Sequence, residues 1–277
     1  MTLEWAVDPT GAGDAQPTVD LTSTGATVTA NDPGDYMVTV RSGDVSAKAT
    51  LAVGDSVAPV ITGMQVSIAD ASSVGPASAR LDVAWTTVES VAVASTKVQR
   101  RIGTGGWKNV SVGSPGAASV EVAFGKRIQF RVRATDAAGN VGAWAQSAAY
   151  RVVAFERSGP GLALTGAWKT KAASQAIGGQ FLRSRVAGAS ATLAFNGVQV
   201  ALIGNRGPNH GRADINLGGS LASSVPLAAS SLELRQILYL SPVAASAAAS
   251  TLQVFNRGAP ASPTLDIDAF LVLTPAT

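Results

Sequence analysis

The sequence predicts an all-β protein built from tandem β-sandwiches. Turn-forming residues interrupt the chain at short intervals, as at Asp32-Pro33-Gly34, Ser114-Pro115-Gly116 and Gly218-Gly219. Between the turns lie short runs in which apolar and polar residues alternate, the pattern of strands with one buried face. No stretch carries the apolar stripe of an amphipathic helix, and the Ala-rich residues 243–250 follow Pro242 and are predicted to form a loop.

Length and composition limit the possible classes of protein. The chain has 277 residues, enough for two or three modest domains, and its 46% hydrophobic and 14% charged residues indicate a folded protein. It contains no cysteine, which excludes disulfides, thiolate metal sites and cysteine nucleophiles. No apolar run approaches the roughly 20 residues that a membrane span needs, so no span is expected. The first residues show no signal peptide.

Charge is distributed unevenly along the chain. Residues 1–54 carry seven acids and two bases, a net charge of −5, whereas residues 55–152 and 153–277 each carry a net charge of +4. An acidic head on a basic body favours head-to-tail association, and chance variation among solvated surfaces is the alternative. The bases are scattered without a dense run, so nucleic-acid binding is not expected.

Residues 1–54 are predicted to form the first domain. Tyr36, Val38 and Val40 mark one strand, and residues 47–53 mark the next. These two strands resemble the last strands of bacterial Ig-like domains, and Leu3-Glu4-Trp5 resembles a strand from the middle of such a domain. The resemblance implies a partial Ig-like domain, whose missing strands would come from an upstream segment or from another protein chain.

Residues 55–153 are predicted to form the second domain. Leu81, Val83 and Trp85 alternate with small or polar residues, and the apolar positions of residues 128–134 alternate with Gln129, Arg131 and Arg133, which predicts a solvated basic face there. Together with Gly106-Trp107 and residues 130–140, these strands resemble a fibronectin type III domain. The tyrosine that usually precedes such a Phe-Arg-Val-Arg run is Ile128 here, so the tyrosine-corner hydrogen bond is not expected.

Residues 154–277 are predicted to form the third domain. Residues 165–168, 204–215 and 265–270 resemble a jelly-roll module of the galactose-binding-like, carbohydrate-binding type, which is common at the C-termini of bacterial secreted proteins. The most specific part is Gly207-Pro208 followed by Gly211, Ala213 and Ile215. The Gly-x-His-Thr-Leu turn often found in that module is replaced by residues 249–252, Ala-Ser-Thr-Leu.

The loop around Gly207-Pro208 is the candidate ligand site. Guanidinium, amide, imidazole and carboxylate groups concentrate there, and these groups form hydrogen bonds to sugars. We predict that any glycan contacts this loop, with Trp168 nearby. The residues are Trp168, Arg206, Asn209, His210, Arg212 and Asp214. The alternatives are that Trp168 belongs to the core and that His210 is a solvated loop residue.

Three acidic residues form a candidate metal site. Asp266 and Asp268 share one face of the last predicted strand, and Glu156 lies on the first strand of the same domain. Because Ca²⁺ prefers clustered oxygen ligands, these acids could bind a structural calcium ion, and exposed acids on an outer face are the alternative. No other cofactor is expected.

Catalysis is not expected. Gly54-Asp55-Ser56-Val57 matches the nucleophile block of Gly-Asp-Ser esterases, but those enzymes need an Asp-x-x-His motif, and the only histidine, His210, has Gly207 three residues before it. Ser56 also lies between two predicted domains, just before Pro59, as a linker residue would. No acidic pair is predicted to line a cleft, as glycosidases require.

These observations together predict a non-catalytic binding or adhesion protein. We expect it at the cell surface or secreted, directed to a glycan or cell-surface polymer through the jelly roll, with the first two domains as spacers. One alternative is a structural protomer of an extracellular filament or virion surface, assembled by strand complementation. The other is an accessory tail of a secreted hydrolase.

Overall fold

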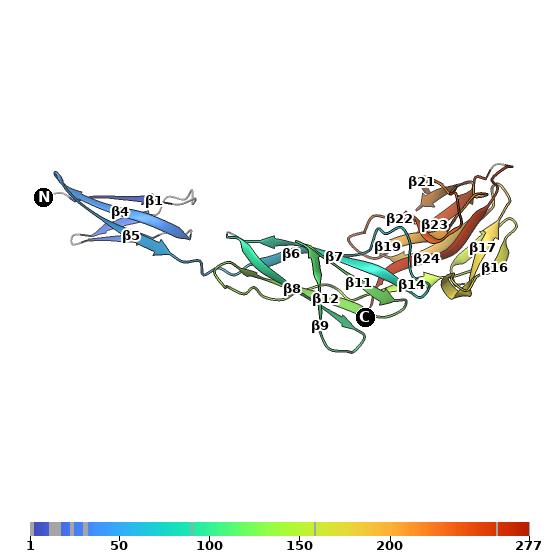
Figure 1. Ribbon diagram of the computed structural model, residues 1–277, viewed down its shortest axis with the longest axis horizontal. Coiled ribbons are helices and arrows are strands. Elements are labelled where there is room, and N and C mark those ends of the chain that lie inside the picture. The colour runs from blue at the N-terminus through green and yellow to red at the C-terminus, as the bar shows by residue number, and fades with distance from the viewer. Residues whose placement is uncertain are drawn as a thin grey trace. The chain divides into compact units, whose positions relative to one another are not determined.

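The computed structural model describes residues 3–10, 18–22, 25–29, 33–89, 91–157, 159–258 and 260–276, and it confirms the all-β class (Figure 1). In this part of the chain the one helical element is the short 3₁₀ helix η1 (Ile177–Gly179). None of the described helical residues forms a segment long and apolar enough to cross a membrane. The chain divides into two compact units: residues 1–60, 88–95 and 134–143 form the first, and residues 61–87, 96–133 and 144–277 form the second.

The N-terminal segment holds a three-stranded antiparallel sheet in the order β1 (Glu4–Pro9), β4 (Gly34–Ser42) and β5 (Val45–Val53). A separate hairpin pairs β2 (Thr18–Thr22) with β3 (Gly25–Thr29). Tyr36 and Val7 are buried, because alternation directs them to the covered face of the sheet. Among the described residues, strand β5 pairs with β4 only, and its first six residues are exposed. The predicted strands at 36–40 and 47–53 are therefore confirmed, and β5 is an open edge.

The middle sandwich has two sheets. One has the order β10 (Val112–Ser114), β11 (Ala117–Ala123), β7 (Ser78–Val88) and β6 (Val60–Ile68). The other has the order β14 (Tyr150–Phe155), β12 (Ile128–Asp136), β8 (Val93–Ile102) and β9 (Lys108–Val110), with β13 (Ala145–Gln146) on β12. Leu81, Val83, Phe130 and Val132 are fully buried, as their alternation predicted. Burial of these side chains between the sheets holds the sandwich together.

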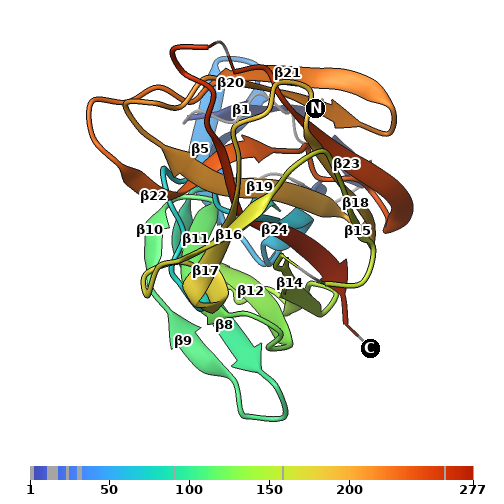
Figure 2. The same ribbon diagram turned by 90° about the vertical axis from the view of Figure 1, so that its right-hand side faces the viewer.

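The C-terminal sandwich packs two curled sheets around one core (Figures 1 and 2). The first sheet has the order β15 (Leu162–Thr165), β18 (Ser190–Gly197), β23 (Ala248–Asn256), β20 (Arg212–Leu217) and β21 (Ser220–Pro226). In the second, β24 (Leu265–Pro275) pairs with β17 (Gln180–Ser184) and β19 (Gln199–Arg206); β16 (Lys169–Ala172) lies beyond β17, and β22 (Glu233–Leu240) beyond β19. Residues 243–247 lie outside any strand, and β23 begins at Ala248.

Strand β14 joins the middle and C-terminal sandwiches. It pairs with β12 only at Ile128 and Tyr150, but with β24 along its whole length, from Tyr150↔Pro275 to Phe155↔Phe270. The amide of Ile68 also donates to the Gln199 side chain at 2.7 Å. The two sandwiches therefore share one sheet, and most of their residues belong to the second compact unit. The predicted division between residues 153 and 154 lies inside this shared strand.

Candidate functional site

In the loop predicted to contact a glycan, some of the polar side chains already have partners within the protein. Arg206 forms an ion pair with Glu233 at 3.5 Å. Asp214 accepts from Arg257 at 2.8 Å and from the Ser224 hydroxyl at 2.6 Å.

Two other candidates from the same loop remain available. Asn209 and Arg212 are exposed. The loop therefore presents two exposed polar side chains rather than the five that the sequence suggested.

His210 is buried, so its interpretation as a solvated loop residue is wrong. Only 4% of it is exposed, and its Nε2 lies 3.0 Å from Oδ2 of Asp266. The backbone of His210 bridges to Thr264, which holds the loop against the start of β24. Gly207 gives the ring room, since a Cβ there would lie 2.9 Å from Nδ1 of His210. The imidazole is therefore a structural partner of Asp266 and cannot be reached by a ligand.

Asp266 is the centre of a buried polar network. Its carboxylate is fully buried and accepts two hydrogen bonds of 2.7 Å from Arg183, on the neighbouring strand β17. Asn205 donates to the same carboxylate at 3.2 Å, in addition to the His210 contact. Burial by itself would raise the pKa of Asp266, but Arg183 and His210 overcome it and lower the pKa below its usual value.

Asp268 lies two residues further along β24 and has the opposite environment. It is 2% exposed; Oδ1 accepts from the Ile177 amide at 2.9 Å, and Oδ2 has no hydrogen-bond partner in the described part of the chain. Burial raises its pKa to about 7, with Glu156 and Asp266 adding to the effect and Arg235 opposing it. A pKa near 7 means that Asp268 takes up its proton as the pH falls through neutrality.

The predicted metal residues are thus buried or half-buried rather than exposed on an outer face. Asp266 uses its oxygens on Arg183, Asn205 and His210, and the Glu156 carboxylate packs against Gly178 in η1. A calcium ion at this place would have to compete with the Arg183 guanidinium, so calcium there stays a prediction that the donor set does not favour.

A different group of acids lies in the first unit. Oxygens of Asp55, Glu89 and Asp136 lie within 4.8 Å of one another, and among the described residues no other group of three has this spacing. Asp136 is 1% exposed and receives both the backbone and side-chain N–H groups of Asn140, and Asp55 receives the Val57 amide. Hard oxygen ligands at this spacing could hold a divalent cation.

Two other sequence candidates also have clear positions. Ser56 is exposed in the connection between β5 and β6, as the linker interpretation predicted. Trp168 packs against the core of the C-terminal sandwich, and its indole N–H donates to the Thr165 carbonyl at 3.1 Å. Trp168 is therefore partly buried against the core, and its one polar atom has a partner.

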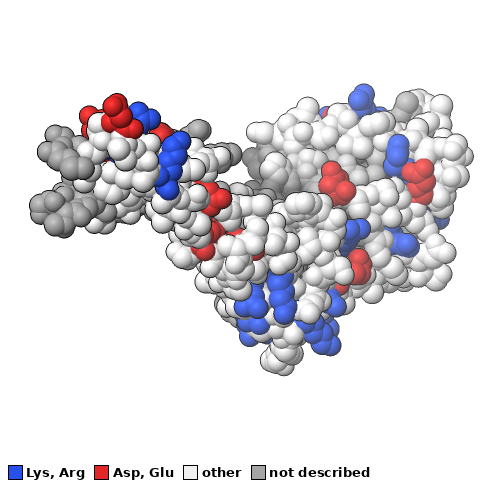
Figure 3. Space-filling model, turned by 60° about the vertical axis from the view of Figure 1, so that its left-hand side comes forward, with Lys and Arg blue, Asp and Glu red and all other residues white. Residues whose placement is uncertain are grey.

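On the basic face of the middle sandwich, arginine side chains stack on tryptophan rings. The guanidinium of Arg131 lies 4.5 Å from the Trp107 ring centroid and 4.2 Å from that of Trp144. Arg101 stacks on Trp107 at 4.8 Å and Arg133 on Trp144 at 4.6 Å. These cations take the ring faces that a sugar would need. Lys and Arg are numerous on this part of the molecule, around β8 and β9 (Figure 3).

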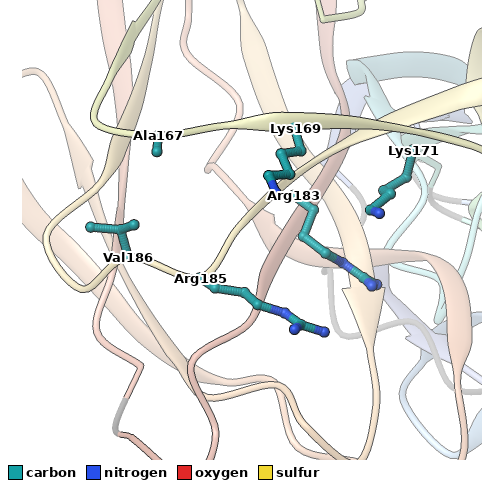
Figure 4. A pocket seen from close by; sticks show the side chains of 6 residues that line it. All are labelled: Ala167, Lys169, Lys171, Arg183, Arg185 and Val186. Carbon is teal, nitrogen blue, oxygen red and sulfur yellow. The ribbon is translucent and has the colours of Figure 1, made fainter.

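A pocket of about 230 Å³ opens on the hairpin of β16 and β17 (Figure 4). We call it the β16–β17 pocket, and its lining residues are Ala167, Lys169, Lys171, Arg183, Arg185 and Val186. Sequence reasoning missed this site. The available signal was the period-two spacing of Lys169 with Lys171, which directs both side chains to one face of β16, and the closeness of Arg183 and Arg185 in the sequence.

The chain is thus an all-β protein whose C-terminal sandwich has the curled sheets of a jelly-roll-like fold. No protein-family model matches the sequence, and no curated protein is significantly similar to it. Several solved structures of enzymes that act on carbohydrates are remotely similar to it. One is a xanthan lyase from Paenibacillus, with 13% identity and a TM-score of 0.36, covering 97% of this chain and 23% of the lyase.

Two further structures show the same remote likeness. An exo-β-1,3-galactanase from Phanerochaete chrysosporium has 12% identity and a TM-score of 0.31, covering 97% of this chain and 68% of the galactanase. A two-domain esterase active on acetylated mannans has 16% identity and a TM-score of 0.31, covering 46% of this chain and 37% of the esterase. The chain therefore spans well under half of the lyase and of the esterase.

Proposed function

We propose that the chain is a non-catalytic glycan-binding protein of the cell surface or extracellular space. In this proposal the C-terminal sandwich binds the glycan, and the two preceding β-segments act as spacers. The observation that carries it is the β16–β17 pocket, an open depression on the C-terminal sandwich lined by four long hydrogen-bond donors. Donors gathered around a small pocket suit the hydroxyl and carboxylate oxygens of a sugar.

Two arrangements support binding without catalysis. The only histidine is buried against Asp266, where it cannot act as a base on a substrate. Trp107 and Trp144 of the middle sandwich are stacked with arginines, which suits a rigid spacer better than a sugar platform.

The test is a panel of immobilised polysaccharides, neutral and acidic, probed with the intact chain. We expect binding to at least one polysaccharide and no release of reducing ends or acyl groups. The triple variant Arg206→Ala, Asn209→Ala, Arg212→Ala should bind as the unchanged chain does, because the pocket lies elsewhere. Binding to no polysaccharide would refute the proposal, and product release that depends on Ser56 would refute its non-catalytic part.

A structural protomer is the second candidate, and the open edge of β5 favours it. Val45 is 74% exposed, and the first six residues of β5 are exposed on both faces. Such an edge presents unpaired backbone groups that another strand can use. If it does so, sedimentation velocity should show larger species as concentration rises, and Val45→Lys with Ala49→Lys should abolish them. A constant monomer mass at all concentrations would exclude this candidate.

A further inference from the structure

We propose that the β16–β17 pocket binds a sugar that carries a carboxylate, such as a uronic acid unit of an acidic polysaccharide. This inference rests on the proposed glycan-binding function and names the class of glycan.

The charge of the pocket is the first argument. Lys169, Lys171, Arg183 and Arg185 line it, and no acidic residue is among its lining residues. Of these four cations, only Arg183 has an ion-pair partner within the described part of the chain, the buried Asp266. The other three cations have no carboxylate within ion-pair distance there. A positive pocket of this kind attracts an anion and disfavours a cationic ligand.

The pairing of β16 with β17 brings these cations close together. Lys169 lies directly opposite Arg183 in the antiparallel pair of β16 with β17, so their side chains emerge on the same face. Lys171 follows Lys169 by two residues within β16 and so lies on the same side, and Arg185 comes directly after the last residue of β17. Figure 4 shows the side chains of Arg183 and Arg185 extending in the same direction, with the two lysines on the neighbouring strand.

Arg183 is held in place before any ligand arrives. Its guanidinium forms the two 2.7 Å hydrogen bonds to Asp266 and lies 5.4 Å from the Phe181 ring centroid. Its side chain is 22% exposed, so the group still borders the pocket. Arg185, in contrast, is exposed, so its planar guanidinium can form hydrogen bonds to a ligand. A guanidinium fork matches a carboxylate through two parallel hydrogen bonds, while the lysines add point charges.

The size and walls of the pocket favour a sugar over a phosphate polymer. Its volume of about 230 Å³ suits one monomer unit. Ala167 and Val186 add apolar wall that the C–H face of a sugar ring can contact. A single-stranded nucleic acid would need a basic groove with stacking aromatic rings, whereas no aromatic residue lines this pocket.

The experiment compares binding of the intact chain to an acidic and a neutral polysaccharide, polygalacturonate and a β-1,3-glucan, with single-stranded DNA as a third probe. We expect binding to polygalacturonate that weakens as salt rises from 0.05 to 0.5 M, because exposed charge pairs are screened. The triple variant Lys169→Ala, Lys171→Ala, Arg185→Ala should lose about tenfold or more in affinity, since it removes three charged hydrogen-bond donors. All three residues are exposed, so folding should be unaffected.

A matched control removes three exposed cations elsewhere, as Arg80→Ala, Lys97→Ala, Lys126→Ala. It changes net charge equally and should bind polygalacturonate as the unchanged chain does. Equal losses of affinity in both triple variants would contradict binding at the β16–β17 pocket and would indicate general charge attraction. Binding to the β-glucan alone would overturn the inference while leaving the proposed function intact. Binding to DNA alone, or to neither polysaccharide, would overturn the inference, and the wider polysaccharide panel then decides the proposed function.

Discussion

Replacing Asp266 by Asn is expected to lower the free energy of unfolding of the C-terminal sandwich by about 3–5 kcal/mol. The carboxylate is fully buried and accepts hydrogen bonds from Arg183 and Asn205, with His210 3.0 Å away. An amide of the same shape leaves the half-buried guanidinium without its counter-charge and presents an N–H group to donors. Removing one partner of a buried pair costs more than the pair contributes, because the other charge remains desolvated.

The measurement is amide hydrogen exchange of β24 read by mass spectrometry, which isolates this sandwich from the rest of the chain. Calorimetry of the intact chain gives the matching shift in melting temperature. Glu233→Gln is the control, because the Arg206–Glu233 pair is 38% exposed on both sides and its loss should change stability by about 1 kcal/mol or less. Equal effects of the two variants would show that the Asp266 network contributes no more than a surface ion pair.

The period-two pattern was enough to predict the strands. The alternation at Leu81, Val83 and Trp85 and at Phe130 and Val132 reports burial on one face of a sheet, and the structure buries all five. Such a pattern describes each strand separately and does not show which strands pair with one another. It could not show that β14 leaves β12 after one residue pair and continues along β24, because strand partners are chosen by tertiary packing.

The candidate site was harder to predict for a related reason. His210 and Asp266 look like a polar loop residue and an acid at the start of a strand, and only the fold brings them to 3.0 Å. The β16–β17 pocket depends on the register that places Lys169 opposite Arg183, which no spacing within either strand reveals. Counting polar residues per segment therefore favoured the Gly207-Pro208 loop, where Arg206 and Asp214 in fact have internal partners.

Replacing Asp268 by Asn is expected to stabilise the C-terminal sandwich at pH 8 and to have little effect at pH 4. Burial raises the pKa of Asp268 from 3.8 to about 7, so the folded state binds this proton more tightly than the unfolded state does. The resulting stability is fully present below about pH 4 and is lost as the pH rises through about 7. At about 1.4 kcal/mol for each pKa unit, the loss amounts to roughly 4 kcal/mol.

Asparagine removes this titration and keeps the useful hydrogen bond. Its side-chain oxygen can still accept from the Ile177 amide, as Oδ1 of Asp268 does at 2.9 Å, and its NH₂ group replaces the unpartnered oxygen. The measurement is the melting temperature of both proteins between pH 4 and pH 8. Asp214→Asn is the contrasting control. The Ser224 hydroxyl lowers the pKa of Asp214, and Arg257 adds to this effect although burial opposes it. This variant should therefore lose stability above pH 4 rather than gain it. Melting curves of Asp268→Asn and the unchanged chain that differ by the same amount at every pH would contradict a proton held on Asp268.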